Sequence, residues 1–329
     1  MSPSDPQKTY SLVADIGGTN TRVALAEGTH LLPETVCRYP NAEFAGLETV
    51  LRAFLDTQDG VACAGACVAV AGPVRDGVGA LTNLDWTIDC ATLARATGTE
   101  TVSILNDLQA QGYSLADLSE DNLRRVIPAP AHAPTHATGA TQIVIGVGTG
   151  FNAAPVFTTD KGRLVTPAEA GHANMPVRTE AELRLLQYVE TAHGFPAIED
   201  VMSGRGLSRI YGWLAHEAGT PKEASAAEIM ARFEAGTDPL AQETAAMFVR
   251  ILGTVAGNLA LIHLPFGGVY LCGGVARAFA PHLDRLGFQA AFRDKGRFAG
   301  FMGNFGVSMI EDDFAALSGC ASHLQEISG

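Results

Sequence analysis

The sequence predicts a duplicated α/β fold built from two domains. Its 329 residues exceed the roughly 250–300 residues at which a single hydrophobic core stops growing. Apolar runs of strand length alternate with longer segments of helical periodicity, which is typical of sheets covered by helices. A strand–glycine–strand unit also occurs twice, at 10–26 and at 141–157. We therefore expect a smaller α/β domain from 1–110 plus 313–329 and a larger α/β domain from 111–312.

The first half begins with a predicted β-hairpin, because two apolar runs, 10–16 and 21–26, flank Gly17-Gly18. An amphipathic helix follows, since apolar side chains recur at the spacing of one helix face, at Leu47, Val50, Leu51, Phe54 and Leu55. Further strands are expected at 35–39, 65–71 and 101–105, and further helices at 90–96 and 108–117.

The second half repeats the strand–glycine–strand start and then becomes mostly helical. Its predicted strands are 141–147, 151–157, 164–166, 268–272 and 306–310. Its predicted helices are 180–192, 200–217, 223–235, 239–263, 276–286, 288–299 and 313–326. The Pro/Ala/His-rich stretch 128–140 is interpreted as a surface loop between the halves. The last helix is expected to return and pack on the first half.

Charge and composition exclude several classes of protein. Lys and Arg number 22 against 35 Asp and Glu, a net charge of −13, which opposes binding of a DNA or RNA duplex. No run of about 18 apolar residues is present, so no membrane span is expected. The polar start lacks the basic-then-apolar pattern of a signal peptide, and we expect a cytoplasmic protein. The six cysteines are scattered, and we expect them to be reduced and mostly buried rather than in a disulfide or a zinc site.

Three glycine turns follow predicted strands and are candidates for holding a nucleotide, the first two at its phosphates and the third at its purine base. They lie at Asp15-Ile16-Gly17-Gly18-Thr19-Asn20, at Gly148-Thr149-Gly150 and at Gly273-Gly274. Glycine lets the backbone approach a ligand and point its N–H groups at it, and Asp15 is an oxygen ligand suited to Mg²⁺. Ordinary tight turns explain each segment equally well when it is taken alone. Open α/β sheets bind ligands at the carboxyl ends of their strands, so two facing sheets would gather all three turns around one cleft.

Four polar segments could carry chemistry, and each also has a structural explanation. Asn106-Asp107 ends a strand, where Asp107 could accept a hydroxyl proton, or the pair could cap the next helix. Glu169 and His172 could hold vicinal sugar hydroxyls, or be a solvated carboxylate and a packed imidazole. Glu199 could do the same, or favour a helix N-terminus. Asn83 is equally well explained as a turn former.

Taken in order, these segments resemble the bacterial glucokinase family of the hexokinase/actin-like ATPase superfamily. The matching segments, which run from about residue 10 to 326, are 12–22, 105–107, 146–151, 169–172, 199–204, 266–270 with 273–275, and 292–298. The chain lacks the cysteine-rich zinc motif of the related repressor/open-reading-frame kinases. Each motif is weak by itself, whereas their ordered set is specific.

The resemblance implies an actin-like ATPase (ribonuclease H-like) fold and ATP-dependent phosphorylation of D-glucose at its 6-hydroxyl. It implies that Asp107 is the catalytic base and that the glucose ligands are Asn83, Asn106, Asp107, Glu169, His172 and Glu199. It implies two phosphate loops, formed by Gly17, Gly18, Thr19, Asn20 and by Gly148, Thr149, Gly150. Asp15 would be the Mg²⁺-side carboxylate, and Gly273 and Gly274 would border the adenosine. The expected partners are glucose, ATP with Mg²⁺ and a second copy in a homodimer, with no nucleic acid and no membrane.

Two segments depart from the family pattern. Ala168 and Ala170 flank Glu169 in a loop that is usually richer in glycine, and Phe151-Asn152 replaces the usual Leu-Gly after the second phosphate loop. Sugar selectivity and ATP affinity are the properties that these changes affect. The alternatives are a kinase for fructose, mannose or glucosamine, a non-catalytic sugar sensor or regulator, and an actin-like filament protein.

Overall fold

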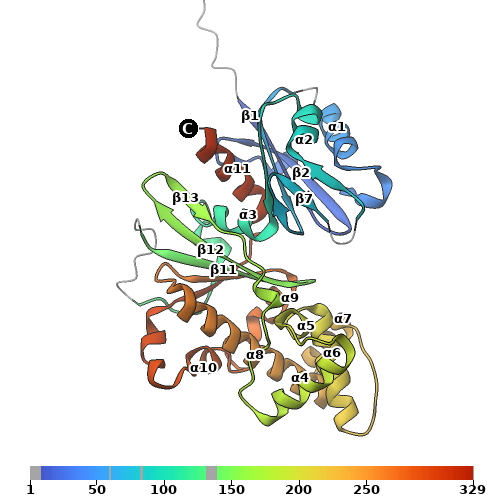
Figure 1. Cartoon of the computed structure of the whole chain (residues 1–329), viewed down its shortest axis with the longest axis vertical. Helices are drawn as coiled ribbons and strands as arrows, with labels where there is room; N and C mark the ends of the chain where they lie inside the picture. The colour runs from blue at the N-terminus through green and yellow to red at the C-terminus, as the bar shows by residue number, and fades with distance from the viewer. Residues whose placement is uncertain (1–8, 59–60, 82–83, 131–138, 329) are drawn as a thin grey trace, which may run out of the picture. The chain divides into compact units, whose positions relative to one another are not determined.

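The computed structural model describes residues 9–58, 61–81, 84–130 and 139–328, and it is a mixed α/β protein (Figure 1). The chain divides into two compact units. Unit 1 contains the residues up to Ser119, Lys161–Val165 and the residues from Asp312 onwards. Unit 2 contains Glu120–Asp160 and Thr166–Glu311. Asn83 and most of the predicted loop 128–140 lie outside the described residues.

Unit 1 is built on a sheet in the order β3-β2-β1-β5-β9, with β4 also paired to β2. Its strands are β1 (Tyr10–Ile16), β2 (Asn20–Glu27), β3 (His30–Leu31), β4 (Cys37–Pro40), β5 (Cys63–Val70) and β9 (Thr101–Asn106). Strands β1 and β2 are antiparallel, as the hairpin prediction requires, whereas β1, β5 and β9 are parallel. Ile16 pairs with Val70 and Val70 with Asn106, so β1 and β9 end at the same edge of the sheet.

The α-helices in the described part of unit 1 are α1 (Leu47–Thr57), α2 (Cys90–Thr97), α3 (Asp107–Ser114) and α11 (Ala315–Ser328). The amphipathic pattern of α1 is confirmed, because Val50, Leu51 and Phe54 are fully buried. Helix α11 packs closely on α3 (Figure 1). A Cβ added to Gly319 would lie 1.7 Å from the Ala110 carbonyl oxygen, so only glycine permits this approach.

A small sheet in the order β6-β7-β8 also belongs to unit 1 and was not expected from the sequence. It consists of β6 (Val74–Arg75), β7 (Val78–Ala80) and β8 (Thr87–Asp89). These strands are two or three residues long, which is too short to show a period-two pattern. Strand β13 (Gly162–Val165) contributes to the same unit, where the Gln109 side chain on α3 donates to the Val165 carbonyl oxygen.

Unit 2 contains strands in the order β10-β15-β14-β11-β12. Their bounds are β10 (Leu123–Ile127), β11 (Thr141–Val147), β12 (Phe151–Thr159), β14 (Val269–Cys272) and β15 (Val307–Ile310). Strand β11 is antiparallel to β12 and parallel to β14, which repeats the pairing of β1 with β2 and β5. Gly146 pairs with Cys272, so β11 and β14 end at one edge. Strand β10 was missed because Arg124-Arg125 interrupts its apolar pattern.

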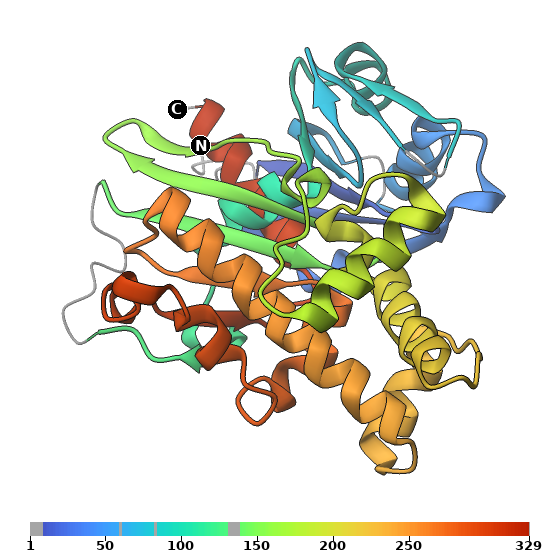
Figure 2. The same cartoon turned by 60° about the horizontal axis from the view of Figure 1, so that its bottom comes forward.

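Among the residues of unit 2 that the structure describes, the α-helices are α4 (Glu180–His193), α5 (Ile198–Val201), α6 (Gly204–Glu217), α7 (Ala226–Ala235), α8 (Pro239–His263), α9 (Gly274–Phe279) and α10 (Phe288–Arg293). Helix α8 runs beside α10, as Figure 2 shows. Among the described helices, α8 alone is long and apolar enough to cross a membrane, but 72% of its most apolar window is buried inside the protein. We therefore interpret α8 as a core helix.

Three helix predictions for unit 2 need correction. The predicted helix 200–217 is two helices, because α5 ends at Val201 and Ser203 then caps α6 by accepting a hydrogen bond from the Gly206 N–H. The predicted helices 276–286 and 288–299 are shorter, and end at Phe279 and Arg293. They continue as separate 3-10 turns, η5 (Ala280–His282) and η6 (Gly296–Phe298). Pro281 and Gly296 interrupt the longer helices, since proline lacks a backbone donor and Gly296 has a φ of +54°.

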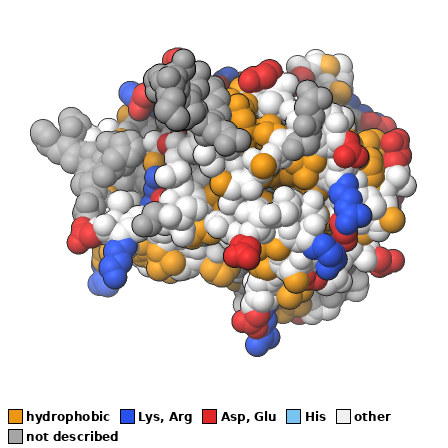
Figure 3. Space-filling model, turned by 90° about the horizontal axis from the view of Figure 1, so that it is seen from above, with side chains coloured by type: hydrophobic (Ala, Val, Ile, Leu, Met, Phe, Trp, Pro, Cys, Tyr) orange, Lys and Arg blue, Asp and Glu red, His pale blue; other side chains and the backbone are white. Residues whose placement is uncertain are grey.

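All six cysteines are free thiols, and Cys67, Cys272 and Cys320 are buried, whereas the other three are half-buried. Acidic and basic side chains are interspersed on the face of the molecule that Figure 3 shows.

Candidate active site

The first glycine loop of unit 1 joins β1 to β2 and is held by a buried asparagine. Asn41 is 2% exposed, donates from Nδ2 to the Gly17 carbonyl oxygen at 2.8 Å and accepts at Oδ1 from the Thr21 hydroxyl at 2.8 Å. Its backbone N–H donates to the Thr19 carbonyl oxygen. Gly18 and Thr19 remain exposed at the tip of the loop. Asn41 was missed in the sequence, where Pro40-Asn41 looks like an ordinary turn.

Asp15 lies just before this loop and faces a cation of its own unit. Its Oδ2 is 4.0 Å from Nη1 of Arg22, and Arg22 also donates to the Asp313 carbonyl oxygen. Burial raises the pKa of Asp15, and the positive charge of Arg22 opposes that rise. Within the described residues no three His, Cys, Asp or Glu side chains gather as a metal site. A single desolvated carboxylate fits Mg²⁺ that arrives with nucleotide phosphates and keeps most of its water.

The start of α3 places Asn106 and Asp107 at the same sheet edge as the first glycine loop. Asn106, 4% exposed, caps α3: its Oδ1 accepts from the Gln109 N–H at 2.6 Å, and Gln109 Oε1 accepts from the Asn106 N–H. The capping explanation therefore holds for Asn106, and its Nδ2 group is the part of the side chain not used in the cap. Asp107 is the first residue of the helix, partly exposed, and its Oδ1 accepts from the Leu108 N–H at 2.9 Å.

The paired register sets the spacing between these two segments. Because β1 and β9 are separated by one strand, their ends lie about 10 Å apart. The loop after β1 and the helix after β9 therefore border the same region of unit 1. This agrees with the expectation that polar side chains gather at the carboxyl ends of parallel strands.

The second and third glycine turns meet in unit 2. The Gly148 N–H donates to the Gly150 carbonyl oxygen, and the Gly148 carbonyl oxygen accepts from the Gly204 N–H at the start of α6, both at 2.9 Å. Gly273 has a φ of +96°, and a Cβ there would lie 2.5 Å from the Val147 carbonyl oxygen. The two turns therefore lie side by side at the edge where β11 and β14 end. Thr149 is exposed between them.

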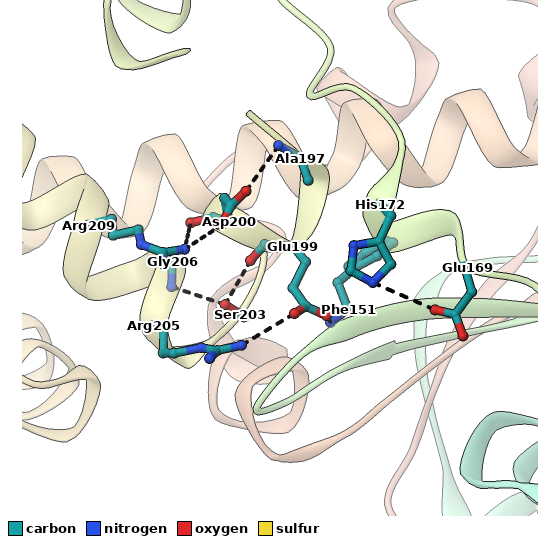
Figure 4. Close-up of polar contacts among 10 residues, drawn as sticks. All are labelled: Phe151, Glu169, His172, Ala197, Glu199, Asp200, Ser203, Arg205, Gly206 and Arg209. Carbon is teal, nitrogen blue, oxygen red and sulfur yellow. Dashed lines mark hydrogen bonds and ion pairs between the residues drawn. The ribbon is translucent and has the colours of Figure 1, made fainter. Parts of the chain in front are cut away.

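Glu199 joins the second glycine turn through its side chain (Figure 4). Its Oε2 accepts from the Phe151 N–H at 3.0 Å, and its Oε1 is 3.3 Å from Nη2 of Arg205. A Cβ on Gly150 would lie 2.5 Å from Glu199 Oε2, so the glycine leaves space for this carboxylate. The break between α5 and α6 orients the segment, because the Ser203 hydroxyl donates to the Glu199 carbonyl oxygen.

Glu169 and His172 lie on a 3-10 turn, η4 (Ala170–His172), beside Glu199 (Figure 4). Glu169 Oε2 is 3.9 Å from His172 Nε2, and the side chains are 56% and 68% exposed. Gly171 brings the turn against β12 and α5, since a Cβ there would lie 2.1 Å from the Phe151 carbonyl oxygen and 3.4 Å from Glu199 Cβ. Unit 2 therefore gathers three of the predicted sugar ligands beside the second glycine turn.

A separate cavity of about 550 Å³ lies elsewhere in unit 2, lined by Tyr188, Ser208, Arg209 and Ser225 among others. None of the predicted site residues lines it. The candidate site is thus identified by convergent polar groups rather than by this cavity.

Comparison with known proteins identifies the family of this chain. The family model described as Glucokinase matches residues 12–327. A glucokinase of Rhizobium leguminosarum bv. trifolii (strain WSM2304) is 31% identical over 95% of this chain and 90% of its own length. A glucokinase of Saccharophagus degradans (strain 2-40) is 33% identical, over 96% of this chain and 98% of its own length.

Solved structures show the same similarity. The crystal structure of glucokinase from an Antarctic psychrotroph matches with a TM-score of 0.85 and 30% identity, over 97% of this chain and 99% of that one. A hexokinase of the ROK type from Thermus thermophilus, at 21% identity and a TM-score of 0.66 over 98% of this chain and all of that one, shares the fold. By its family match and its curated relatives, this chain belongs to the glucokinase family.

Proposed function

We propose that this protein transfers the γ-phosphoryl group of ATP to the 6-hydroxyl of D-glucose, giving glucose 6-phosphate and ADP. As a member of the glucokinase family it is a hexose kinase, a phosphotransferase with an alcohol acceptor. The observation that carries the proposal is the cluster of Glu169, His172 and Glu199 built directly beside the second glycine turn. Hydroxyl-binding and phosphate-binding groups are adjacent there, as a sugar kinase requires.

We propose that the two units are duplicated halves of an actin-like fold and the smaller and larger domains of the enzyme. The same pairing pattern in both units supports the duplication. Strand β1 is antiparallel to β2 and parallel to β5, and β11 is antiparallel to β12 and parallel to β14. In this proposal, one sugar and one nucleotide are bound by residues of both units in a common cleft.

The sugar would be held by carboxylates, an imidazole and an amide. Glu169 and His172 have exposed side chains, and a carboxylate can accept hydrogen bonds from two neighbouring hydroxyls. Glu199 would accept from a hydroxyl while it keeps the Phe151 N–H. Asn106 would offer Nδ2, with Asn83 as a further ligand from the first half.

The nucleotide would be held mainly by backbone N–H groups. Gly17, Gly18, Thr19 and Asn20 would form the first phosphate loop, and Gly148, Thr149 and Gly150 the second. Gly273 and Gly274 would border the adenosine. Asp15 would hold Mg²⁺, which when bound neutralises negative charge on the transferring phosphoryl group.

Asp107 would serve as the base in a direct in-line transfer. The 6-oxygen attacks the γ-phosphorus, the bond from that phosphorus to the oxygen shared with the β-phosphate breaks, and ADP leaves with the electron pair. The proton of the 6-hydroxyl moves to the Asp107 carboxylate. The carboxylate is at the N-terminus of α3, directly after the sheet edge that carries Asn106.

The test is purified protein with Mg-ATP and a panel of sugars, with ADP release measured in a coupled assay. We expect glucose to be the best acceptor by kcat/KM. A preference for fructose, mannose or glucosamine would assign another hexose kinase, and binding without turnover would indicate a sensor. Sedimentable polymer formed with ATP would indicate a filament protein. We also propose a cytoplasmic homodimer without nucleic-acid or membrane partners.

A further inference from the structure

We propose that Asn152 is a positioning residue that holds the loop 168–172 in the shape required for sugar binding. It touches neither proposed substrate and acts through Glu169, so the inference rests on the proposed role of that carboxylate. Asn152 is the second residue of β12, directly after the Phe151 N–H that binds Glu199, and it pairs with Gly146 of β11.

The Asn152 side chain holds the backbone on both sides of Glu169. Its Nδ2 donates to the Ala168 carbonyl oxygen at 2.5 Å, and its Oδ1 accepts from the Ala170 N–H at 3.0 Å. The same Oδ1 accepts from the Ala153 N–H at 2.8 Å. These partners determine the amide orientation. With O and N exchanged, the side-chain oxygen would face the Ala168 carbonyl oxygen, and the side-chain NH₂ would face the N–H groups of Ala153 and Ala170.

Glu169 needs such support because its backbone is neither helical nor extended, with φ −124° and ψ 53°. Its side chain is 56% exposed, and its Oε2 is 3.9 Å from Nε2 of His172. Side-chain contacts therefore do little to hold it. The loop has two backbone hydrogen bonds of its own, from His172 N–H to Glu169 O and from Ala173 N–H to Ala170 O. Both use the Glu169 carbonyl or groups that follow it in the chain. Asn152 supplies a hydrogen bond on the other side of Glu169, to the carbonyl oxygen of Ala168.

A loop that is ordered before the sugar arrives binds more tightly, since the cost of ordering is not subtracted from the binding energy. Asn152 stands at a position where the family pattern has glycine, which has no side chain to form this clamp. Ala168 and Ala170 flank Glu169 where glycine is usual. Asn152 therefore contacts the backbone of both of the other residues that depart from the pattern.

The test compares Asn152→Ala with Asn304→Ala. Asn304 is a matched control, because it also makes a side-chain hydrogen bond to backbone within unit 2, to the Phe301 carbonyl oxygen, outside the site. We expect Asn152→Ala to raise the KM and the calorimetric Kd for glucose about 10-fold, equivalent to about 1.4 kcal/mol. The kcat should fall less than 3-fold, and the KM for ATP should change less than 2-fold. An unchanged glucose Kd, or an equal rise in the KM for ATP, would overturn the proposal.

Asn152→Asp adds a readout that a purely structural role would not move. The ionised carboxylate keeps the acceptor for Ala170 N–H but repels the Ala168 carbonyl oxygen, whereas the protonated form again donates to it. The ratio of the variant's glucose KM to that of the parent protein should therefore fall toward one as pH is lowered. For Asn152→Ala the same ratio should stay constant. A constant ratio for Asn152→Asp would contradict the donor role.

Glu169→Gln separates failure of the clamp from failure of the proposed function. If Glu169→Gln raises the glucose KM and Asn152→Ala does not, the positioning role of Asn152 is wrong, whereas the sugar-binding role of Glu169 is supported. If Glu169→Gln has no effect, the role of Glu169 is wrong, and the clamp falls with it. If both residues act through one loop, the double variant should raise the glucose KM by less than the product of the two single-variant fold-changes.

Discussion

Asp107 is the residue whose chemistry is least replaceable in the proposed mechanism, because an amide at this position accepts no proton. We expect Asp107→Asn to lower kcat by at least 10²-fold, within the range contributed by a general base. Glucose binding measured by calorimetry should change less than about 3-fold, since the amide still offers an oxygen at the start of α3. Asp56→Asn, on an exposed position of α1, is the control. Full turnover in Asp107→Asn would refute the assignment.

Gly150 tests whether Glu199 must occupy its observed position. The Cβ of Gly150→Ala would lie 2.5 Å from Glu199 Oε2, and the flexible carboxylate would move away rather than the backbone. We expect a rise in the glucose KM of about 10-fold, from loss of one charge-assisted hydrogen bond, with little change in thermal stability. Gly303→Ala is the control, since a Cβ there meets nothing within 4 Å. Equal KM values for the two variants would show that Glu199 does not bind the sugar.

Residue types suggested, and the family resemblance assigned, which side chains of unit 2 bind one sugar. Glu169, His172 and Glu199 come together there, as expected for sugar ligands. Asn41 and Asn152 were not assigned their supporting roles, because asparagine in a turn or at the start of a strand has many ordinary explanations. Their partners lie 24 and 16 residues away, and no local pattern identifies such a contact.

At the scale of elements, the contact between α3 and α11 depends on one glycine. The Cβ of Gly319→Ala would meet the Ala110 carbonyl oxygen at 1.7 Å, which forces the helices apart and shifts the element that carries Asp107. We expect a loss of about 2–4 kcal/mol in the free energy of unfolding, measured by denaturant titration. Gly212→Ala is a matched helix-interior control: its Cβ meets only atoms 4.0 Å away, so it should be neutral or stabilising by up to about 1 kcal/mol. Comparable losses in the two variants would contradict this packing.

A buried histidine on α11, His323, makes the stability of unit 1 depend on pH. Burial lowers the pKa of His323 from 6.5 to about 4, and its Nε2 is 2.8 Å from the Ser103 hydroxyl oxygen. The unfolded chain therefore binds a proton that the folded chain does not between pH 6.5 and 4. The contribution of His323 to the free energy of unfolding is fully present above pH 6.5. It is lost as pH falls through this window, by about 2 kcal/mol at pH 5.

The check is the free energy of unfolding at pH 7 and pH 5. The loss between these values should be smaller by about 2 kcal/mol in His323→Gln than in the parent protein. His30→Gln, at an exposed position on β3, should keep the parent's dependence. A His323→Gln variant that loses as much stability as the parent would show that another group titrates.

The elements themselves followed largely from periodicity, and the errors have local causes. The break at Met202-Ser203 was missed because the apolar pattern continues across it, whereas Ser203 satisfies the first backbone donors of α6 and separates it from α5. The Ser203 hydroxyl at this break also donates to the Glu199 carbonyl oxygen, which helps to position that residue. Strands β6 to β8 are formed by pairing with one another, which a pattern of two or three residues does not reveal.

For the whole molecule, the proposed function predicts that glucose draws the two units together, since Asp107 belongs to unit 1 and Glu169 and Glu199 to unit 2. We expect saturating glucose to decrease the radius of gyration in small-angle X-ray scattering. Asp107→Asn should keep this response, because it retains binding, and Glu199→Gln should require more glucose for it. No change at saturation in the parent protein would contradict closure and leave the chemistry to be tested by turnover.

The sequence by itself determined the classes of most elements, the repeated strand–glycine–strand unit, the acidic balance and, through its ordered motifs, the family. These are local properties, set by the period of apolar residues and by glycine at strand ends. The tertiary structure decided how the site is supported: Asn41 under the first glycine loop, Asn152 on both sides of Glu169, Ser203 beneath Glu199, and Gly319 between α3 and α11. Most of these contacts join residues distant along the chain, and they exist because buried backbone groups must find partners wherever the folded chain passes.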